Sequence, residues 1–193
     1  MAAAYDTRWQ TYNQRSLTPT LAAIRSNRIE KLLDIGCGTG LLLGEIRQAV
    51  PEAGLTGCDI TPAMLELAAH RLGDAVSLQR AAAESLPFDD NSFDTVVCSN
   101  SSQYFNDPPQ AFREMQRVMV SGGHLILTAW VSDQLLPRIH YRVLQRLHPS
   151  VRQVPQSGWY TSLLEQLGYG ICSCDVYRYS LWGLCTIKAK LLR

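Results

Sequence analysis

Three glycines and two carboxylates have the spacing of a nucleoside-binding site. Gly36, Gly38 and Gly40 form a glycine-rich turn that follows Asp34, and Asp59 lies 19 residues beyond the last glycine. That interval is close to the ~20 residues expected before an acid that binds a ribose. Glycines let a ligand approach the backbone, and a carboxylate can accept hydrogen bonds from both ribose hydroxyls. The pattern predicts a pocket for an adenosine-containing ligand.

The same turn disfavours a pyrophosphate. A dinucleotide-binding turn has its third glycine three residues after the second, where this chain has Leu41, and no Gly-Lys-Ser/Thr of a phosphate-binding loop follows. Asp34, two residues before Gly36, would repel phosphate and attract an ammonium group. We therefore expect adenosine joined to a positive group, and an NAD-dependent dehydrogenase is the least favoured class.

A sheet must bring these residues together, and strand-like segments alternate with helical ones along the chain. Strands are predicted over 30–35, 54–59, 75–80, 93–98, 124–130, 171–179 and 182–190, and helices from 41, over 63–72, from 108, over 136–148 and over 159–167. This alternation predicts an α/β fold with a doubly wound, mostly parallel sheet, and the alternating period of the last two strands predicts an antiparallel edge. Ligands of such sheets bind beyond the carboxyl ends of the strands, where the strand order reverses.

Length and composition predict a single domain over residues 1–193. Hydrophobic residues make up 46% of the chain and the net charge is +1, which gives no general field for nucleic acid. The charge is uneven, because residues 1–107 hold 8 basic and 13 acidic side chains while 108–193 hold 10 and 4. This asymmetry weakly favours an anionic ligand near the C-terminal half.

No apolar stretch is long enough to span a membrane, and the N-terminus lacks the apolar segment of a signal peptide. We therefore expect a cytoplasmic protein without a membrane partner. The six cysteines have no CxxC spacing, so we expect reduced thiols and no metal site.

Four blocks, in order over about residues 28–130, resemble the class I S-adenosylmethionine-dependent methyltransferases. They are 33–40 with the glycines, 57–64 with Asp59, 83–94 and 113–126. The resemblance implies a Rossmann-like, seven-stranded methyltransferase fold and S-adenosyl-L-methionine as cofactor.

The resemblance also implies which residues bind the cofactor. The three glycines would lie along its methionine and ribose, Asp34 would hold its amino group and Asp59 its ribose. Side chains near the adenine and the methionine would be Ile60, Met64, Ala83, Glu84 and Ser99.

The acceptor-facing segment should be 98–106, which lacks family motifs. Many relatives carry a histidine pair here, where this chain has Ser102, Gln103 and Tyr104. Asn100 precedes a serine rather than the two prolines of adenine methyltransferases, which disfavours DNA. The catalytic residue is unknown. Tyr104 could orient an acceptor or line the core, and His140 and Tyr141 are the other candidates.

Two further segments could shape the acceptor site. Residues 1–28 are expected to form one or two helices broken by Pro19, which either pack on the sheet or act as a lid. Residues 131–170 could set acceptor specificity. Within them Arg138, Arg142 and Arg146 lie on one helix face, which is either solvated or binds a carboxylate or phosphate.

The sequence as a whole predicts methylation of a small molecule at O, N or C by in-line transfer, by a monomer or homodimer. A non-catalytic cofactor-binding protein and a tRNA or protein methyltransferase remain alternatives. The spread of basic residues without interleaved aromatics gives no support for a nucleic-acid partner.

Overall fold

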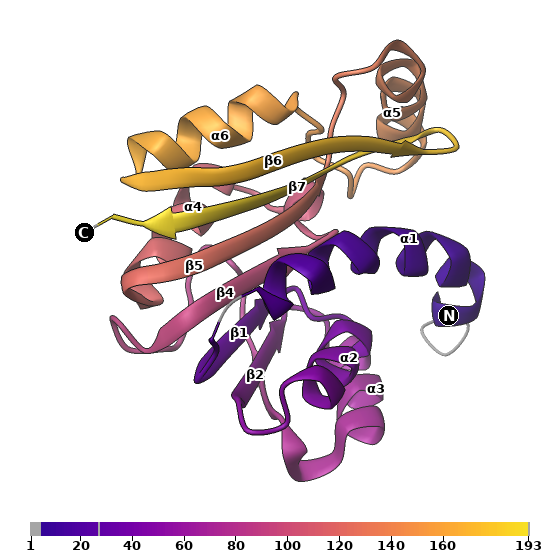
Figure 1. Ribbon diagram of the computed structural model, residues 1–193. Helices are drawn as coiled ribbons and strands as arrows, with labels where there is room; N and C mark the ends of the chain where they lie inside the picture. Colours follow the sequence, from indigo (N-terminus) through magenta and orange to yellow (C-terminus); the bar gives the residue numbers. More distant parts are fainter. Residues whose placement is uncertain (1–4, 27, 193) are drawn as a thin grey trace.

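The computed structural model describes residues 5–26 and 28–192, with side chains from residue 9 onward (Figure 1). Seven strands form one sheet: β1 (Lys31–Ile35), β2 (Gly54–Asp59), β3 (Ser77–Arg80), β4 (Phe93–Ser99), β5 (Met119–Trp130), β6 (Tyr169–Tyr179) and β7 (Trp182–Leu191). The α-helices are α1 (Tyr5–Arg25), α2 (Leu41–Ala49), α3 (Pro62–Leu72), α4 (Pro108–Val118), α5 (Leu135–Leu147) and α6 (Ser157–Gln166). Two short 3-10 helices are η2 (Gly73–Ala75) and η3 (Ser102–Tyr104).

The strand order is β3-β2-β1-β4-β5-β7-β6. Pairings from β3 to β5 are parallel, and β7 runs antiparallel to both of its neighbours. The predicted α/β fold with an antiparallel edge is confirmed. The order reverses between β1 and β4, which places the switch point directly after Ile35 and Ser99. No helix of the described chain has the length and apolarity to cross a membrane.

Helices cover both faces of the sheet because its central strands are apolar on both sides. In β4, Val96 belongs to the core cluster that contains Phe112 of α4 and Leu164 of α6. The next residue, Val97, belongs to the cluster that contains Ile24 of α1 and Ile46 of α2. Successive side chains of a strand point to opposite faces, so this near-continuous apolar run requires a helical layer on each side.

Helix α1 runs unbroken through Pro19, so the expected break is wrong. Proline removes one backbone hydrogen bond of a helix. Here the Thr20 hydroxyl donates to the Ser16 carbonyl and lies 2.7 Å from Thr128 Oγ1 of β5, while Ile24 is fully buried. These contacts hold the helix on the sheet across the proline.

Met119 is the first residue of β5, which therefore begins before the expected start at His124. It pairs with Phe93, and the register shifts between Phe93 and Thr95. This irregularity accommodates Gly122, with φ of +75°, and Gly123, whose Cβ would lie 2.9 Å from the Asp94 carbonyl oxygen. The paired glycines therefore lie within a bulged part of the strand.

Candidate functional site

The glycine turn after β1 packs closely on the loop after β4 and leaves room for a ligand beside its backbone. Gly36 has φ of +73°, and a Cβ on it would lie 2.5 Å from Ser101 Oγ, so only glycine fits there. A Cβ on Gly38, with φ of +54°, would meet nothing within 4 Å. The backbone at Gly38 therefore faces open space that a ligand can fill.

Asp59, at the carboxyl end of β2, is tied to this turn. Its Oδ2 accepts a hydrogen bond from the Gly38 backbone N–H at 2.9 Å, and its Oδ1 accepts one from the Thr61 N–H at 2.8 Å. These two bonds fix the carboxylate between the turn and the start of α3. Each carboxylate oxygen has a second lone pair, so the group can still accept bonds from two hydroxyls.

Asp34 lies inside β1 and is only 2% exposed. Burial, assisted by the negative charge of Asp59, raises the pKa of its carboxyl group to about 7. The site thus holds two neighbouring carboxyl groups, of which the buried one resists ionisation. A cationic ligand would relieve this cost, as the sequence predicts for an ammonium group.

Two adjoining hollows lie at the switch point. One, of about 300 Å³, brings together most predicted site residues with parts of the β4–α4 loop. Its lining includes Gly36, Gly38, Asp59, Ile60, Met64, Ala83, Glu84, Asn100, Tyr104 and Phe105. The other, of about 90 Å³, adds Asp34 and Ser99 together with Asn13 and Leu17 of α1. Gly36, Gly38 and Asn100 line both, so the two hollows adjoin.

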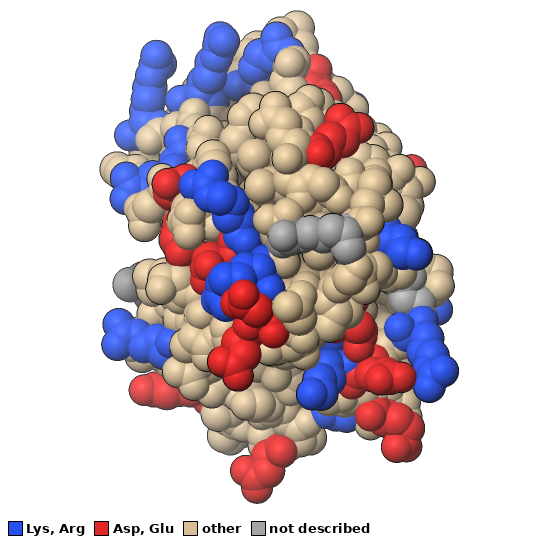
Figure 2. Space-filling model, turned by 90° about the vertical axis from the view of Figure 1, so that its left-hand side faces the viewer, with Lys and Arg blue, Asp and Glu red and all other residues tan. Residues whose placement is uncertain are grey.

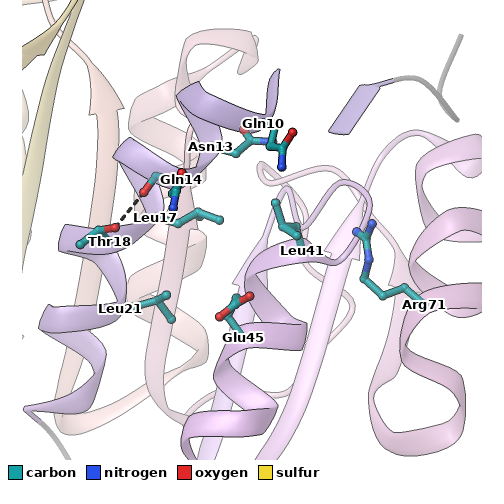
Figure 3. Close-up of a pocket in the computed structure, with 9 residues that line it drawn as sticks. All are labelled: Gln10, Asn13, Gln14, Leu17, Thr18, Leu21, Leu41, Glu45 and Arg71. Atoms are coloured by element: carbon teal, nitrogen blue, oxygen red, sulfur yellow. Dashed lines mark hydrogen bonds between the residues drawn. The ribbon is translucent and has the colours of Figure 1, made fainter. Parts of the chain in front are cut away.

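A larger groove, of about 590 Å³, lies between α1 and α2 (Figure 3). It shares Asn13, Leu17 and Leu41 with the smaller hollow. In Figure 3 the amide side chains of α1 face Leu41 and Glu45 of α2 across the groove. The groove therefore extends the smaller hollow from the glycine turn along α1.

Gly40 lines neither of the two hollows at the switch point. It has φ of +74°, and its Cβ would lie 2.7 Å from Leu72 Cδ1 and 3.1 Å from Ala68 Cβ. Glycine is therefore required at position 40, because a larger residue would collide with α3 where it packs against α2.

Glu84 lies in the wall of the larger switch-point hollow and holds a neighbouring loop. Its Oε1 accepts hydrogen bonds from the backbone N–H groups of Asn106 at 2.7 Å and Asp107 at 3.2 Å. Asp107 in turn caps α4 by accepting a bond from the Gln110 N–H. Glu84 thus joins the loop after β3 to the loop after β4.

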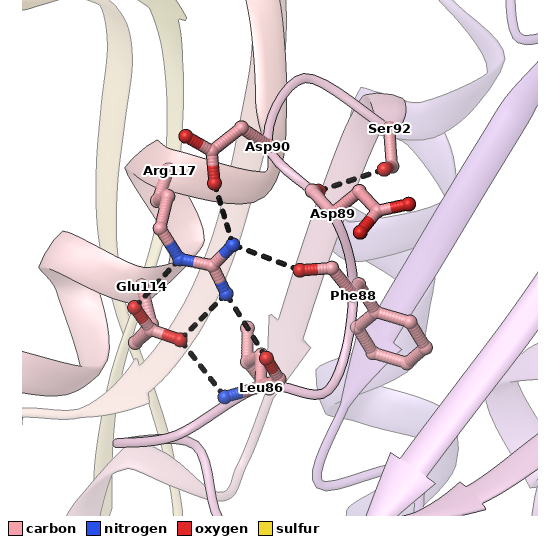
Figure 4. Close-up of polar contacts among 7 residues, drawn as sticks. All are labelled: Leu86, Phe88, Asp89, Asp90, Ser92, Glu114 and Arg117. Carbon is pink, nitrogen blue, oxygen red and sulfur yellow. Dashed lines mark hydrogen bonds and ion pairs between the residues drawn. The ribbon is translucent and has the colours of Figure 1, made fainter.

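Arg117 of α4 anchors the rest of the loop after β3 (Figure 4). Its guanidinium donates to the carbonyls of Leu86 and Phe88 and forms ion pairs with Glu114 and Asp90. Glu114 also accepts a bond from the Leu86 N–H. The pKa of the Arg117 guanidinium is raised chiefly by its hydrogen bonds to Glu114 and Asp90. This role was not predicted from the sequence, because the contacts of Arg117 with the loop join residues 27 to 31 positions apart.

Asn100, like Arg117, has a role in the site that was not predicted from the sequence. It has φ of +55°, a conformation in which asparagine is enriched. Its Oδ1 accepts a 2.6 Å bond from the Tyr12 hydroxyl, and its Nδ2 donates to Ser16 Oγ. An asparagine just after a buried strand was the available signal.

Tyr104 lines the larger hollow, with its ring edge against Trp130. Burial raises the pKa of its hydroxyl, so the group is protonated near neutral pH and can donate a hydrogen bond rather than act as a base.

His140 and Tyr141, the other candidates for the acceptor site, line neither hollow at the switch point. Tyr141 is buried, stacks on Trp130 and donates its hydroxyl to the Gly183 carbonyl. His140 packs edge-on against Trp182, and burial lowers its pKa. Both side chains hold α5 on the β5–β7 edge. Arg138 and Arg142 line a separate hollow with Tyr141.

A family model described as a methyltransferase domain matches residues 33–127. The chain is 33% identical over 172 residues to a ubiquinone/menaquinone biosynthesis C-methyltransferase of Hahella chejuensis, covering 76% of this chain and 68% of that protein. It is 35% identical over 100 residues to a demethylmenaquinone methyltransferase of Deinococcus radiodurans, covering 50% and 42%. Its fold is similar to the methyltransferase chain of a complex with the Haloferax volcanii Trm112 activator, with a TM-score of 0.83, 20% identity and coverage of 98% and 96%.

The raised pKa of Asp34 predicts a pH-dependent stability change on its replacement. In wild type the unfolded chain loses this proton near pH 4 and the folded chain near pH 7, so folding is penalised progressively as pH rises from 4 to 7. Asp34→Asn should therefore stabilise the ligand-free protein at pH 8, on the order of 2–4 kcal/mol, with little effect at pH 4. Urea unfolding across this range measures the difference. The exposed control Asp74→Asn should show no such trend, and equal pH slopes for both variants would contradict the assignment.

Loss of the Arg117 anchor should loosen the loop after β3. Arg117→Met leaves the Leu86 and Phe88 carbonyls without their donor and Glu114 without its cation, so the free energy of unfolding should fall by about 1–3 kcal/mol. Proteolysis within residues 81–92 should accelerate. Arg113→Met is the matched control, because Arg113 bonds Gln110 on its own helix. The same proteolysis rate in both variants would show that Arg117 does not hold the loop.

Proposed function

Because this chain belongs to the S-adenosylmethionine-dependent methyltransferases, we propose that the two hollows at the switch point bind the cofactor and that the acceptor is a small quinone-type molecule, methylated at a ring carbon. The observation that carries the site assignment is the convergence of Asp34, Gly38 and Asp59 on two adjoining hollows at the reversal of strand order. Ligands of open parallel sheets bind there.

The residues present fit the cofactor. Gly38 leaves open the space that a Cβ would fill, and Asp59 is fixed with lone pairs available for a ribose. Asp34 has the raised pKa of a carboxyl group that a cation would stabilise in its ionised form. When bound, S-adenosylmethionine supplies a methyl group activated by a sulfonium.

The protein's part in the reaction is to bind, orient and exclude water. Ile60, Met64 and Ala83 provide an apolar wall for a flat base, and Tyr104 can donate a hydrogen bond to an acceptor oxygen. Positioning alone can supply most of the rate acceleration of a methyl transfer, because the nucleophile, the methyl carbon and the sulfur must be in line. A bond from the ring carbon to the methyl group would replace the methyl–sulfur bond, and the ring carbon would then lose its proton to water to restore the aromatic ring. Among the described residues, no histidine lines the two hollows to accept that proton.

The quinone-type acceptor is supported by the names of the relatives, two of which act on quinones or their precursors. Aromatic side chains beside the pocket favour a flat ring. Tyr104 and Phe105 line it, and Trp130 lies against Tyr104 with ring centroids 6.1 Å apart. Offset or edge-on packing against such side chains suits a planar acceptor.

We also propose that α1 acts as a lid and that residues 131–170 shape acceptor choice. The contacts of α1 support its part: Tyr12 donates to Asn100 in the pocket wall and accepts from Trp130 Nε1 at 2.7 Å. Asn13 and Leu17 line the smaller hollow. Residues 131–170 reach the site through Arg152, whose N–H donates to the Gln103 carbonyl.

Calorimetric titration with S-adenosylmethionine and its demethylated product tests the site. Both should bind with micromolar affinity, and Asp59→Ala should weaken them at least ~30-fold, because two charge-assisted hydrogen bonds of about 1 kcal/mol or more each are lost. Asp89→Ala, an exposed aspartate outside the hollows, is the control. NAD should not bind.

Labelled methyl transfer to a reduced demethylmenaquinone analogue tests the acceptor. Label on a ring carbon supports the proposal, and label on oxygen would refute carbon specificity. Cofactor binding without transfer to any small acceptor would favour a non-catalytic binding protein. Transfer to RNA with a steep salt dependence would favour the nucleic-acid alternative.

The lid assignment predicts a kinetic effect of Tyr12→Phe. Loss of the hydroxyl removes the bonds to Asn100 and Trp130, so the KM of the acceptor should rise by about 3–10-fold with a smaller change in kcat. Tyr179→Phe, in the same aromatic cluster, is the matched control and should leave both constants unchanged. An unaltered KM in Tyr12→Phe would dismiss α1 as a lid.

A further inference from the structure

The outward face of α5 carries half of the large exposed hydrophobic side chains of the described chain. Ten such side chains are exposed, and five of them lie on this one helix. We call them the α5 ridge: Leu135, Leu136, Ile139, Val143 and Leu147, each between 49% and 69% exposed. Leu135, Ile139, Val143 and Leu147 follow one another at intervals of four residues, and Leu136 lies three residues before Ile139, so the five form one continuous stripe along the helix. The inner side of the helix packs on the protein through the buried residues Pro137 and Tyr141.

A row of positive charge flanks this ridge. Arg138, Arg142 and Arg146 follow one another at intervals of four residues, and residues 134–156 hold four arginines and two histidines but no acidic residue. In the described structure the three arginines of α5 form no ion pair. Figure 2 views the molecule from the left-hand side of Figure 1, away from α5, and shows basic and acidic side chains intermixed over the lower part of that face.

A polar hollow of about 360 Å³ lies on the arginine side of the ridge. Arg138 and Arg142 line it with the side chains of Ser132, Gln145 and Gln156. The hollow contains hydrogen-bond donors and two guanidinium groups beside an apolar stripe, and arginine forks match phosphate oxygens. The helix therefore presents both an apolar contact and a phosphate contact to the same side of the molecule.

We propose that the α5 ridge and its arginine row dock this protein on an anionic phospholipid surface. The ridge contacts the boundary between headgroups and acyl chains, and the arginines contact lipid phosphates. The exposed Leu181, at the tip of the β6–β7 hairpin, extends the apolar contact, because its neighbour Trp182 packs on His140 of α5. This is peripheral contact by one helix face and needs no spanning segment.

The charges beside the α5 ridge favour an anionic phospholipid surface over a second copy of the chain as its partner. A symmetric antiparallel pairing of two α5 ridges would bring both arginine rows to the same side of the contact, with no acidic residue on α5 to pair them. Phospholipid headgroups supply the missing negative charge. The expectation of no membrane partner was based on overall charge and on the lack of a long apolar stretch, and neither criterion detects a single amphipathic face.

Vesicle flotation of the full chain tests the proposal without cofactor or acceptor, so its outcome is independent of the proposed function. The protein should bind phosphatidylcholine vesicles containing phosphatidylglycerol about tenfold more tightly than pure phosphatidylcholine vesicles, and added salt should weaken the difference. Ile139→Ser/Val143→Ser should reduce binding to both vesicle types. Arg142→Gln/Arg146→Gln should lose about tenfold on anionic vesicles only.

The matched controls change the same residue types at other exposed sites. Val176→Ser and Arg28→Gln should bind as wild type, and circular dichroism should confirm that every variant is folded. The absence of vesicle binding, or equal binding of the α5 variants and the controls, would overturn the proposal. So would light scattering that shows a dimer abolished by Ile139→Ser/Val143→Ser while vesicle binding is unchanged, since the ridge would then be a subunit interface.

Discussion

The near-contact between Gly36 and Ser101 is the constraint on which the site depends. The two residues follow neighbouring parallel strands at the point where the strand order reverses. Ser101 Oγ donates to the Ile35 carbonyl at 3.0 Å and occupies the space that a Gly36 side chain would need. This contact fixes the separation of the two turns, and both adjoining hollows share Gly36 as a wall. A larger residue at position 36 would separate the turns and so remove the floor of the pocket.

A second constraint is electrostatic. Asp34 is enclosed by the sheet and lies within the field of Asp59, whose two oxygens each accept one hydrogen bond, from the Gly38 and Thr61 N–H groups. The ligand-free protein therefore carries an unfavourable carboxyl pair at its centre. Such a pair lowers stability and raises the affinity for a cation, which is a common compromise at functional sites. The two turns and the two acids together explain why the pocket suits a positively charged nucleoside.

Much of this arrangement could be predicted from sequence because it is local. The apolar runs of β1 and β4, the glycine turn and the interval to Asp59 all lie within short windows whose physics is decided by neighbours along the chain. The mostly parallel sheet followed from the alternation of strands and helices, and the antiparallel edge from the period of the last two strands. The strand order was not predicted and comes from the structure. The pairing of Met119 with Phe93 was not predicted either, because a helical apolar spacing continued smoothly into a strand whose start is set by β4.

The remaining features depend on contacts between residues far apart. Tyr12 and Asn100 are 88 residues apart in sequence, and Arg117 reaches back to the carbonyls of Leu86 and Phe88. No periodicity encodes such pairs. For α5, the period correctly placed its arginines on one face, but only the packing of Tyr141 against Trp130 determines which face is turned outward. That packing separates the arginines from the pocket and leaves the α5 ridge exposed. The segment 131–170, in which no family motif is recognised, therefore carries the exposed apolar face for which we propose a partner.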